Sequence, residues 1–209
     1  ADYSSLIYGA LTYNPTIPVY NADGSYADNP SRHNVYPNPV SLLDITDQTQ
    51  VRNFSISGWG ELKLLKDLTM RGTLGYDTKD TQSDTYIPTT TLAGKSENGK
   101  AAKRDNKYHM QMANITATYA KKFIDIHDFS VIAGWEFKKQ TYEGMQVGAT
   151  NFPRDEQLMN DLGASLSKAD VGSWKGSSTM SSWFGRINYT LLDRYILTAN
   201  LRGDGSSNF

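Results

Sequence analysis

The feature that most constrains the fold of this chain is a set of long segments in which apolar and polar residues alternate. From residue 51 onward, the alternation has a period of two, which indicates strands with one apolar face. We expect strands at about 51–64, 68–86, 107–120, 129–144, 178–190 and 195–203. Strands of globular proteins usually have about 5 or 6 residues, whereas a tilted strand that crosses a bilayer needs ~9–11. The lengths therefore favour an all-β, transmembrane sheet.

The connections between these segments alternate in length. The joins at 65–67, at 121–128 and just before residue 195 are short, whereas those around 87–106 and 145–177 are long. In an up-and-down antiparallel sheet, alternate connections lie at the same end, so short turns and long loops would be sorted to opposite rims. Outer-membrane barrels have this asymmetry, with short periplasmic turns and long extracellular loops. The sequence therefore predicts part of an antiparallel, up-and-down β-barrel.

The two faces of the predicted sheet differ in polarity. Aromatic rings near the ends of the apolar face suit the headgroup level of a membrane, so we expect a girdle there. Its members are Tyr119, Phe129, Trp135, Trp183, Tyr189 and Tyr195. The opposite face carries charges that are costly to bury unpaired. We expect Arg71, Glu136, Arg186 and Arg202 to face a lumen.

Composition excludes several other classes of protein. The chain has no cysteine, a net charge of -1 and no apolar run long enough for a membrane-spanning helix. Its three histidines, at 33, 109 and 127, lack the spacing of metal ligands, and the neighbouring Asp77, Asp80 and Asp84 fit solvated strand charges better than a pair of glycosidase carboxylates. We predict no enzyme activity, no cofactor and no metal site.

The first 50 residues differ from the rest and are rich in Pro, Asn, Asp and Tyr. We expect an extracellular loop region with a small hairpin at 17–26, where Asp23 and Gly24 would form the turn. The same residues suggest a calcium loop, but the ligand spacing of an EF-hand is missing, and a plain turn fits better.

Five stretches resemble the SusC/RagA family of TonB-linked outer-membrane proteins. They are NPTIPVYNADGSY (14–26), LKDLTMRGTLGYD (65–77), AGWEF (133–137), NFPRD (151–155) and SSWFGRINYTLLDRYILTANLRGDGSS (181–207). The resemblance implies a 22-strand barrel around an N-terminal plug, a SusD-like surface lipoprotein as a lid, and energy supplied through TonB. It also implies import of oligosaccharides or peptides at the cell outer membrane. Because plug, TonB box and most strands are missing, we expect an internal barrel segment, 51–209, preceded by the loop region 1–50.

The predicted long loops supply candidate contacts for the nutrient or the lid. Tyr86 and Trp174 could stack on sugar rings, and Asn151 and Arg154 could hydrogen-bond hydroxyl groups. Arg186 and Arg202, on neighbouring strands, could meet acidic groups of the plug. Two alternatives stay open at this point. One is a SusC-like barrel that serves as a structural scaffold in another outer-membrane complex, and the other is a soluble, carbohydrate-binding β-sandwich.

Overall fold

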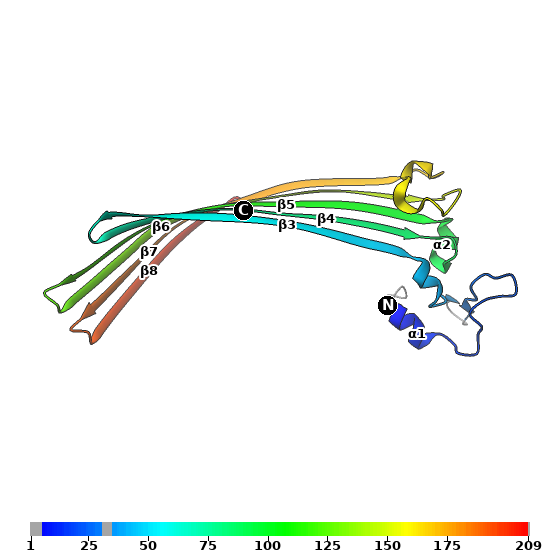
Figure 1. Cartoon of the computed structure of the whole chain (residues 1–209), viewed down its shortest axis with the longest axis horizontal. Helices are drawn as coiled ribbons and strands as arrows, with labels where there is room; N and C mark the ends of the chain where they lie inside the picture. Colours follow the sequence, from blue (N-terminus) through cyan, green and yellow to red (C-terminus); the bar gives the residue numbers. More distant parts are fainter. Residues whose placement is uncertain (1–5, 31–34, 209) are drawn as a thin grey trace. The chain divides into compact units, whose positions relative to one another are not determined.

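One antiparallel sheet of six strands dominates the computed structural model, which describes residues 6–30 and 35–208 (Figure 1). The strands are β3 (Thr46–Leu65), β4 (Leu68–Ile87), β5 (Lys100–Phe123), β6 (His127–Thr150), β7 (Asp170–Leu191) and β8 (Tyr195–Ser206). They lie in the sheet in chain order, so each strand pairs with its neighbour in sequence. The only other sheet within the described ranges is the two-stranded pair β1 (Asn29–Pro30) and β2 (Val35–Tyr36). A β-sandwich needs two sheets packed face to face, whereas all six long strands belong to one sheet.

The connections between the six strands alternate between short and long. Residues 66–67, 124–126 and 192–194 form the short turns, and 88–99 and 151–169 form the long loops. The last two short turns share a geometry, because Ile124, Asp125, Leu192 and Asp193 all have positive φ. Positive φ at both central residues gives a turn the twist that suits a β-hairpin. The predicted sorting of short turns and long loops is therefore present.

The strands extend further toward the long loops than the sequence pattern indicates. β5 begins at Lys100 rather than near 107, and β7 begins at Asp170 rather than near 178. In these extensions both faces carry polar residues, such as Arg104 and Asp105 in β5. The hydrogen bonds between strands continue in these extensions, although the alternation of apolar and polar residues has ended. The strand ends were predicted from that alternation, so the predicted strands were too short.

The described residues form two compact units, which we treat separately. The loop unit comprises residues up to Val51, Thr81–Asn106 and Gly144–Trp174, and the wall unit comprises Arg52–Asp80, Lys107–Glu143 and the residues from Lys175 onward. In the wall unit, the register of β7 and β8 pairs Gly185 with Leu201 and Tyr189 with Leu197 on one face. On the other face it pairs Phe184 with Arg202. The apolar and polar faces predicted for this hairpin are thus matched across the two strands.

The segment before the sheet contains the helix α1 (Leu6–Thr12) and the 3-10 helix η1 (Ser41–Asp44). Tyr20 and Tyr26 form an isolated antiparallel bridge around a turn in which the Asp23 carboxylate accepts bonds from the backbone N–H and hydroxyl of Ser25. The buried Asn38 amide donates to the carbonyls of Val19 and Ala27, at 2.7 and 3.0 Å. In this segment, which has little regular secondary structure, side chains thus provide hydrogen bonds for the backbone N–H and C=O groups.

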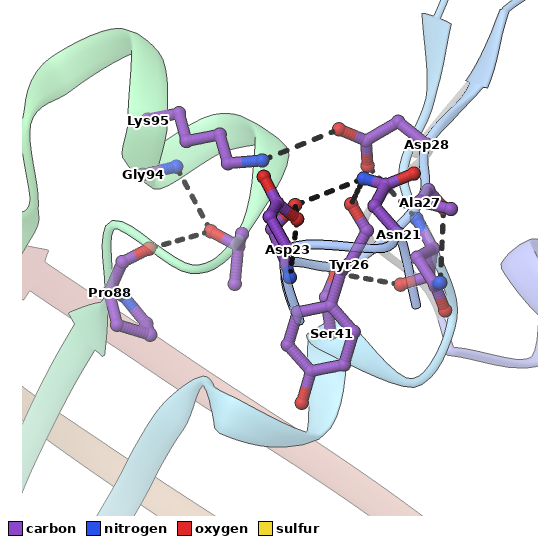
Figure 2. Close-up of polar contacts among 12 residues, drawn as sticks. Asn21, Asp23, Tyr26, Ala27, Asp28, Ser41, Pro88, Gly94 and Lys95 are labelled. Carbon is purple, nitrogen blue, oxygen red and sulfur yellow. Dashed lines mark hydrogen bonds and ion pairs between the residues drawn. The ribbon is translucent and has the colours of Figure 1, made fainter. Parts of the chain in front are cut away.

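This segment docks on the loop between β4 and β5, which contains the helix α2 (Leu92–Glu97). Nζ of Lys95 lies 3.9 Å from a carboxylate oxygen of Asp28, and the Thr90 hydroxyl donates to Asp44 at 2.9 Å. Figure 2 draws the contact between Lys95 and Asp28. At the start of α2 the Thr91 hydroxyl accepts a bond from the N–H of Gly94. A Cβ on Gly94 would lie 1.8 Å from the Pro88 carbonyl oxygen, so only glycine fits this turn. No helix among the described residues has the length and apolarity required to cross a membrane.

Candidate functional site

The apolar face of the wall unit exposes large hydrophobic side chains. Ile56, Leu74, Trp183 and Leu201 are 58, 69, 68 and 80% exposed. Soluble monomers rarely expose contiguous apolar patches larger than a few hundred Å². Further along β6 the same face changes to Lys139 and Glu143, and Glu143 pairs with Lys175 at 3.0 Å. The apolar band therefore ends near Phe137.

Three of the predicted girdle residues have direct contacts on this face. The rings of Trp135 and Trp183 lie 6.3 Å apart, and the indole N–H of Trp135 donates to the Ser181 hydroxyl. Near the short turns, the Tyr189 hydroxyl lies 2.7 Å from Nδ1 of His127. The polar atoms of Trp135 and Tyr189 are thus partnered within the sheet. Tyr119, Phe129 and Tyr195 also lie near the short turns, in β5, β6 and β8.

Charged groups of the polar face form a small network in the wall unit. Arg202 donates from Nε to Asp204 at 2.8 Å and from Nη2 to the Ser182 hydroxyl at 3.0 Å, and its Nη2 lies 3.6 Å from Glu136. Arg186 on the neighbouring strand donates to the Asn188 side chain. Arg202 already has carboxylate partners within the sheet. Arg186 is therefore the better candidate of the two for a plug contact, which stays a prediction.

Arg71 lies on the same polar face but in the first hairpin. Its guanidinium carbon lies 4.4 Å from the centre of the Trp59 ring, which is 64% exposed. A guanidinium over an indole face is a cation–π contact. Trp59 was not predicted as a functional residue, because the apolar alternation of this strand falls on even-numbered positions such as Phe54 and Ile56.

In the loop unit, one carboxylate connects the two long loops. Asp155 accepts hydrogen bonds from the Tyr86 hydroxyl at 2.6 Å, from the Thr89 backbone N–H and from the Thr89 hydroxyl. Around this point lies a cluster of buried residues, which we call the loop cluster: Tyr86, Ala101, Ala149, Phe152 and Met159. Tyr86 has no exposed surface, and its ring meets Phe152 edge-on at 5.8 Å. Tyr86 therefore cannot stack on a ligand unless this cluster opens.

Backbone bonds join the same two loops beside the loop cluster. The N–H of Phe152 donates to the carbonyl of Asn98, and the N–H of Asn151 donates to the carbonyls of Glu97 and Gly99. The Asn98 amide also donates to the side-chain oxygen of Asn151 at 2.8 Å. Asn151 is thus occupied in holding the loops together. Arg154, by contrast, is exposed and lies in the loop as predicted, where it is accessible to a ligand or a lid.

Trp174 does not lie in a loop, contrary to the prediction. It belongs to β7, because that strand begins at Asp170. A Cβ on Gly144 would lie 2.5 Å from Cζ2 of Trp174, so the indole lies across this glycine of β6. The residue as a whole is 39% exposed. An aromatic side chain covering a glycine of the neighbouring strand is a known device for stabilising sheets.

Because the phenol of Tyr86 is buried, the stability of the loop cluster should depend on pH. Burial, followed by the hydrogen bond to the Asp155 carboxylate, raises the pKa of Tyr86 above its ordinary value. A raised pKa in the folded state means that the stabilisation is complete below the ordinary tyrosine value of about 10 and is lost as the pH rises above it. A dye attached at Arg154→Cys should therefore report loop opening that increases above pH ~10. Tyr86→Phe should remove this dependence, and an unchanged profile in that variant would contradict the assignment.

Metal ligands are not gathered anywhere in the described part of the chain. No group of three or more histidine, cysteine, aspartate or glutamate residues is placed to hold an ion there. His109 instead stacks beside Tyr76, and His127 beside Tyr189. His33 lies outside the described residues.

Comparison with known proteins identifies relatives of the whole chain. It is 29% identical to TonB-dependent receptor P3 of Formosa agariphila over 205 residues, which cover 98% of this chain and 20% of that protein. It is 25% identical to TonB-dependent receptor SusC of Bacteroides thetaiotaomicron, and the match covers 100% of this chain and 22% of SusC. No family model matches. The chain thus spans about a fifth of the length of the curated relatives it matches.

Solved structures with the same fold include those of the RagAB peptide importer. Its open-open state matches with a TM-score of 0.72 at 19% sequence identity, over 91% of this chain and 22% of the matched chain. The closed-closed state gives a TM-score of 0.71. The sheet is therefore a segment of an antiparallel, up-and-down, transmembrane β-barrel. The resemblance to the SusC/RagA family, predicted from the five sequence stretches, is confirmed.

Proposed function

We propose that this chain, which shares its fold and motifs with SusC/RagA proteins, forms part of the wall of a TonB-dependent nutrient importer in the cell outer membrane. The observation that carries the proposal is the match of nearly the whole chain to TonB-dependent receptors. The two faces of the wall unit support it, because one exposes apolar side chains and the other carries the Arg202 network. The first face suits lipid and the second a water-filled lumen. We assign the chain no catalytic role.

We further propose that the loop unit contacts a SusD-like surface lipoprotein and the cargo, which is an oligosaccharide or a peptide. Asp155 and the backbone bonds around Asn151 hold the two long loops as one platform, to which the N-terminal segment is joined by Lys95 and Thr90. Exposed apolar side chains on this segment include Ile7, Leu11 and Leu43, at 73, 81 and 65%. A preformed platform with apolar side chains suits a lasting protein contact, because little ordering is needed on binding.

The experiment uses the full natural protein in its own cell. We expect it in the outer-membrane fraction, with a gel mobility that changes on heating, and we expect a tagged copy to co-purify with a surface lipoprotein. Uptake of the cargo should cease when either this protein or TonB is removed. Uptake that continues without TonB, or recovery of the protein in the soluble fraction, would refute the proposal. Uptake through an unrelated TonB-dependent receptor of the same cell is the matched control for the TonB deletion, since it should also cease when TonB is removed.

A further inference from the structure

A hollow opens on the apolar face of the wall unit, at the end of the apolar band that is nearer to the long loops. Its volume is about 420 Å³, and its lining includes Gly58 of β3, Leu74 and Tyr76 of β4, Ala113 of β5 and Phe137 of β6. Small residues leave this space open, since no atom lies within 4 Å of the position that a Cβ on Gly58 would take. Because this face of the sheet exposes apolar side chains to the bilayer, the hollow has the polarity and the place to hold part of an acyl chain.

Polar side chains lie immediately beyond the hollow on the same face. Lys139 follows Phe137 by two residues in β6 and is exposed. Gln140 contacts Met110 across β6 and β5, so on the opposite face Lys139 lies across from Gln111. Gln111 itself lines the hollow. An ammonium group and an amide therefore lie on neighbouring strands at the rim of the hollow.

An imidazole lies at the same rim. His109 precedes Gln111 by two residues, and its ring stacks beside Tyr76 with 6.4 Å between the ring centres. Its Nδ1 lies 3.4 Å from the Tyr76 hydroxyl, which leaves Nε2 for a further partner. Because Tyr76 also lines the hollow, its ring connects the apolar space with the polar rim. Aromatic residues with one polar end are typical of the boundary between hydrocarbon and headgroups.

Lys139 has no carboxylate partner, unlike lysines at the other rim of the wall. Near the first short turn, Lys121 lies 3.6 Å from Asp67. No carboxylate oxygen in the described part of the chain lies within 4 Å of Nζ of Lys139. The next carboxylate on this face of β6 is Glu143, four residues further on, and it is paired with Lys175 at 3.0 Å. An unpaired ammonium group at the edge of the apolar band is complementary to an anionic headgroup.

We propose that the wall unit binds a phosphate-bearing lipid of the bilayer here, with an acyl chain in the hollow and the phosphate on Lys139. The amide of Gln111 and Nε2 of His109 donate to the remaining phosphate oxygens. Under the proposed function the long loops are extracellular, so the lipid belongs to the outer leaflet. The site goes beyond import, because it involves neither the cargo nor TonB and needs only that this face lies in a bilayer.

The combination of the hollow with the cation favours a lipid phosphate over other ligands. A free phosphate gains nothing from the apolar hollow, and at an exposed lysine it competes with water. An uncharged lipid gains nothing from Lys139. Phe137 and Lys139 are two residues apart, about 7 Å along the strand, so the apolar and the cationic contact fit adjacent parts of one molecule.

The test measures the binding of three probes to the full natural protein in detergent: phosphatidic acid, diacylglycerol with the same chains, and inorganic phosphate. Native mass spectrometry counts the molecules bound and gives each affinity. We expect phosphatidic acid to bind most tightly, because it alone carries both the phosphate and the chains. Its affinity should fall as salt is added, since salt screens the attraction between exposed charges.

Two pairs of variants test the two parts of the site. Lys139→Gln should weaken phosphatidic acid about fivefold, the usual contribution of one basic residue near an anionic lipid surface. Lys79→Gln is its matched control, because it removes the same charge from the polar face of β4. Gly58→Leu fills the hollow and should also weaken the lipid, whereas Gly60→Leu, at a glycine with equally open space outside the hollow, should not. Heat-dependent gel mobility verifies that each variant is folded.

Three results would overturn the lipid site. They are equal affinity for phosphatidic acid and diacylglycerol, inorganic phosphate binding as tightly as phosphatidic acid, and equal lipid affinity in Lys139→Gln and Lys79→Gln. None of these results affects the importer proposal, which depends on uptake that requires TonB. Uptake that is independent of TonB would refute the importer but leave the measured lipid affinities intact. The two proposals therefore fail by different measurements.

Discussion

Replacing Asp155 with alanine should weaken the attachment of the loop 151–169 to the loop 88–99 and leave the wall of the barrel folded. Asp155 accepts bonds from the Tyr86 hydroxyl and from both the N–H and the hydroxyl of Thr89. Alanine leaves the hydroxyl of the fully buried Tyr86 without this partner. An unsatisfied buried polar group costs about 1–3 kcal/mol, and hydrogen bonds to a charged acceptor contribute about 1.5–3 kcal/mol. We expect a loss of about 3 kcal/mol in the local stability of the loop cluster.

Local opening of this kind is best measured by protease cleavage of the loop in intact cells or in detergent. Cleavage of a transiently open segment follows the population of the open form. A loss of about 3 kcal/mol should therefore increase the cleavage rate by roughly 100-fold. Glu156→Ala, which changes the adjacent exposed carboxylate, is the matched control and should leave the rate unchanged. Tyr86→Phe should have a smaller effect than Asp155→Ala, because it removes one bond and leaves the Thr89 bonds. Equal cleavage of Asp155→Ala and the unmodified protein would show that this carboxylate does not hold the loops.

The sheet could be predicted from the sequence because its two faces differ sharply in polarity, and this difference is visible between residues that are adjacent in the chain. In the β7–β8 hairpin, Ile187 and Leu201 alternate with Arg186 and Arg202, and one slip in register would put these charges among the apolar residues. The lengths of the connections supplied the second signal, since a turn such as 192–194 and a loop such as 151–169 differ plainly in sequence.

The candidate site could be predicted only in part, because its arrangement depends on contacts between distant residues. Tyr86 was recognised as a notable aromatic residue, but its partner Asp155 is 69 positions away in the chain. Trp174 was assigned to a loop because the polarity of both faces is similar near Asp170, so the start of β7 gave no signal. In the structure, a side chain of the neighbouring strand lies over each of two glycines in this region, Trp174 over Gly144 and Gln146 over Gly172.

Replacing Leu201 with arginine should reduce the stability of the assembled barrel by about 2–4 kcal/mol, because the new charge would lie on the lipid-facing side of the wall near the middle of the apolar band. Leu201 is 80% exposed and lies opposite Gly185. The aromatic rings of Tyr189 and Trp183 lie on the same face, on either side of Gly185 along β7. No side chain on the glycine can shield the guanidinium. The residue also lies too far from the strand ends for a long side chain to reach water without cost.

The measurement is the urea concentration at which the full natural protein, in lipid vesicles, loses its heat-dependent gel mobility. Thr198→Arg is the matched control, since Thr198 lies on the other face, where its hydroxyl already donates to the Asn188 side chain. An arginine there can donate to the same oxygen and stay hydrated. We expect a clear fall in the midpoint for Leu201→Arg and little change for Thr198→Arg. Equal midpoints for the two variants, or a larger fall for Thr198→Arg, would mean that the exposed apolar face is covered by protein rather than lipid, and the assignment of the outer surface would then be reversed.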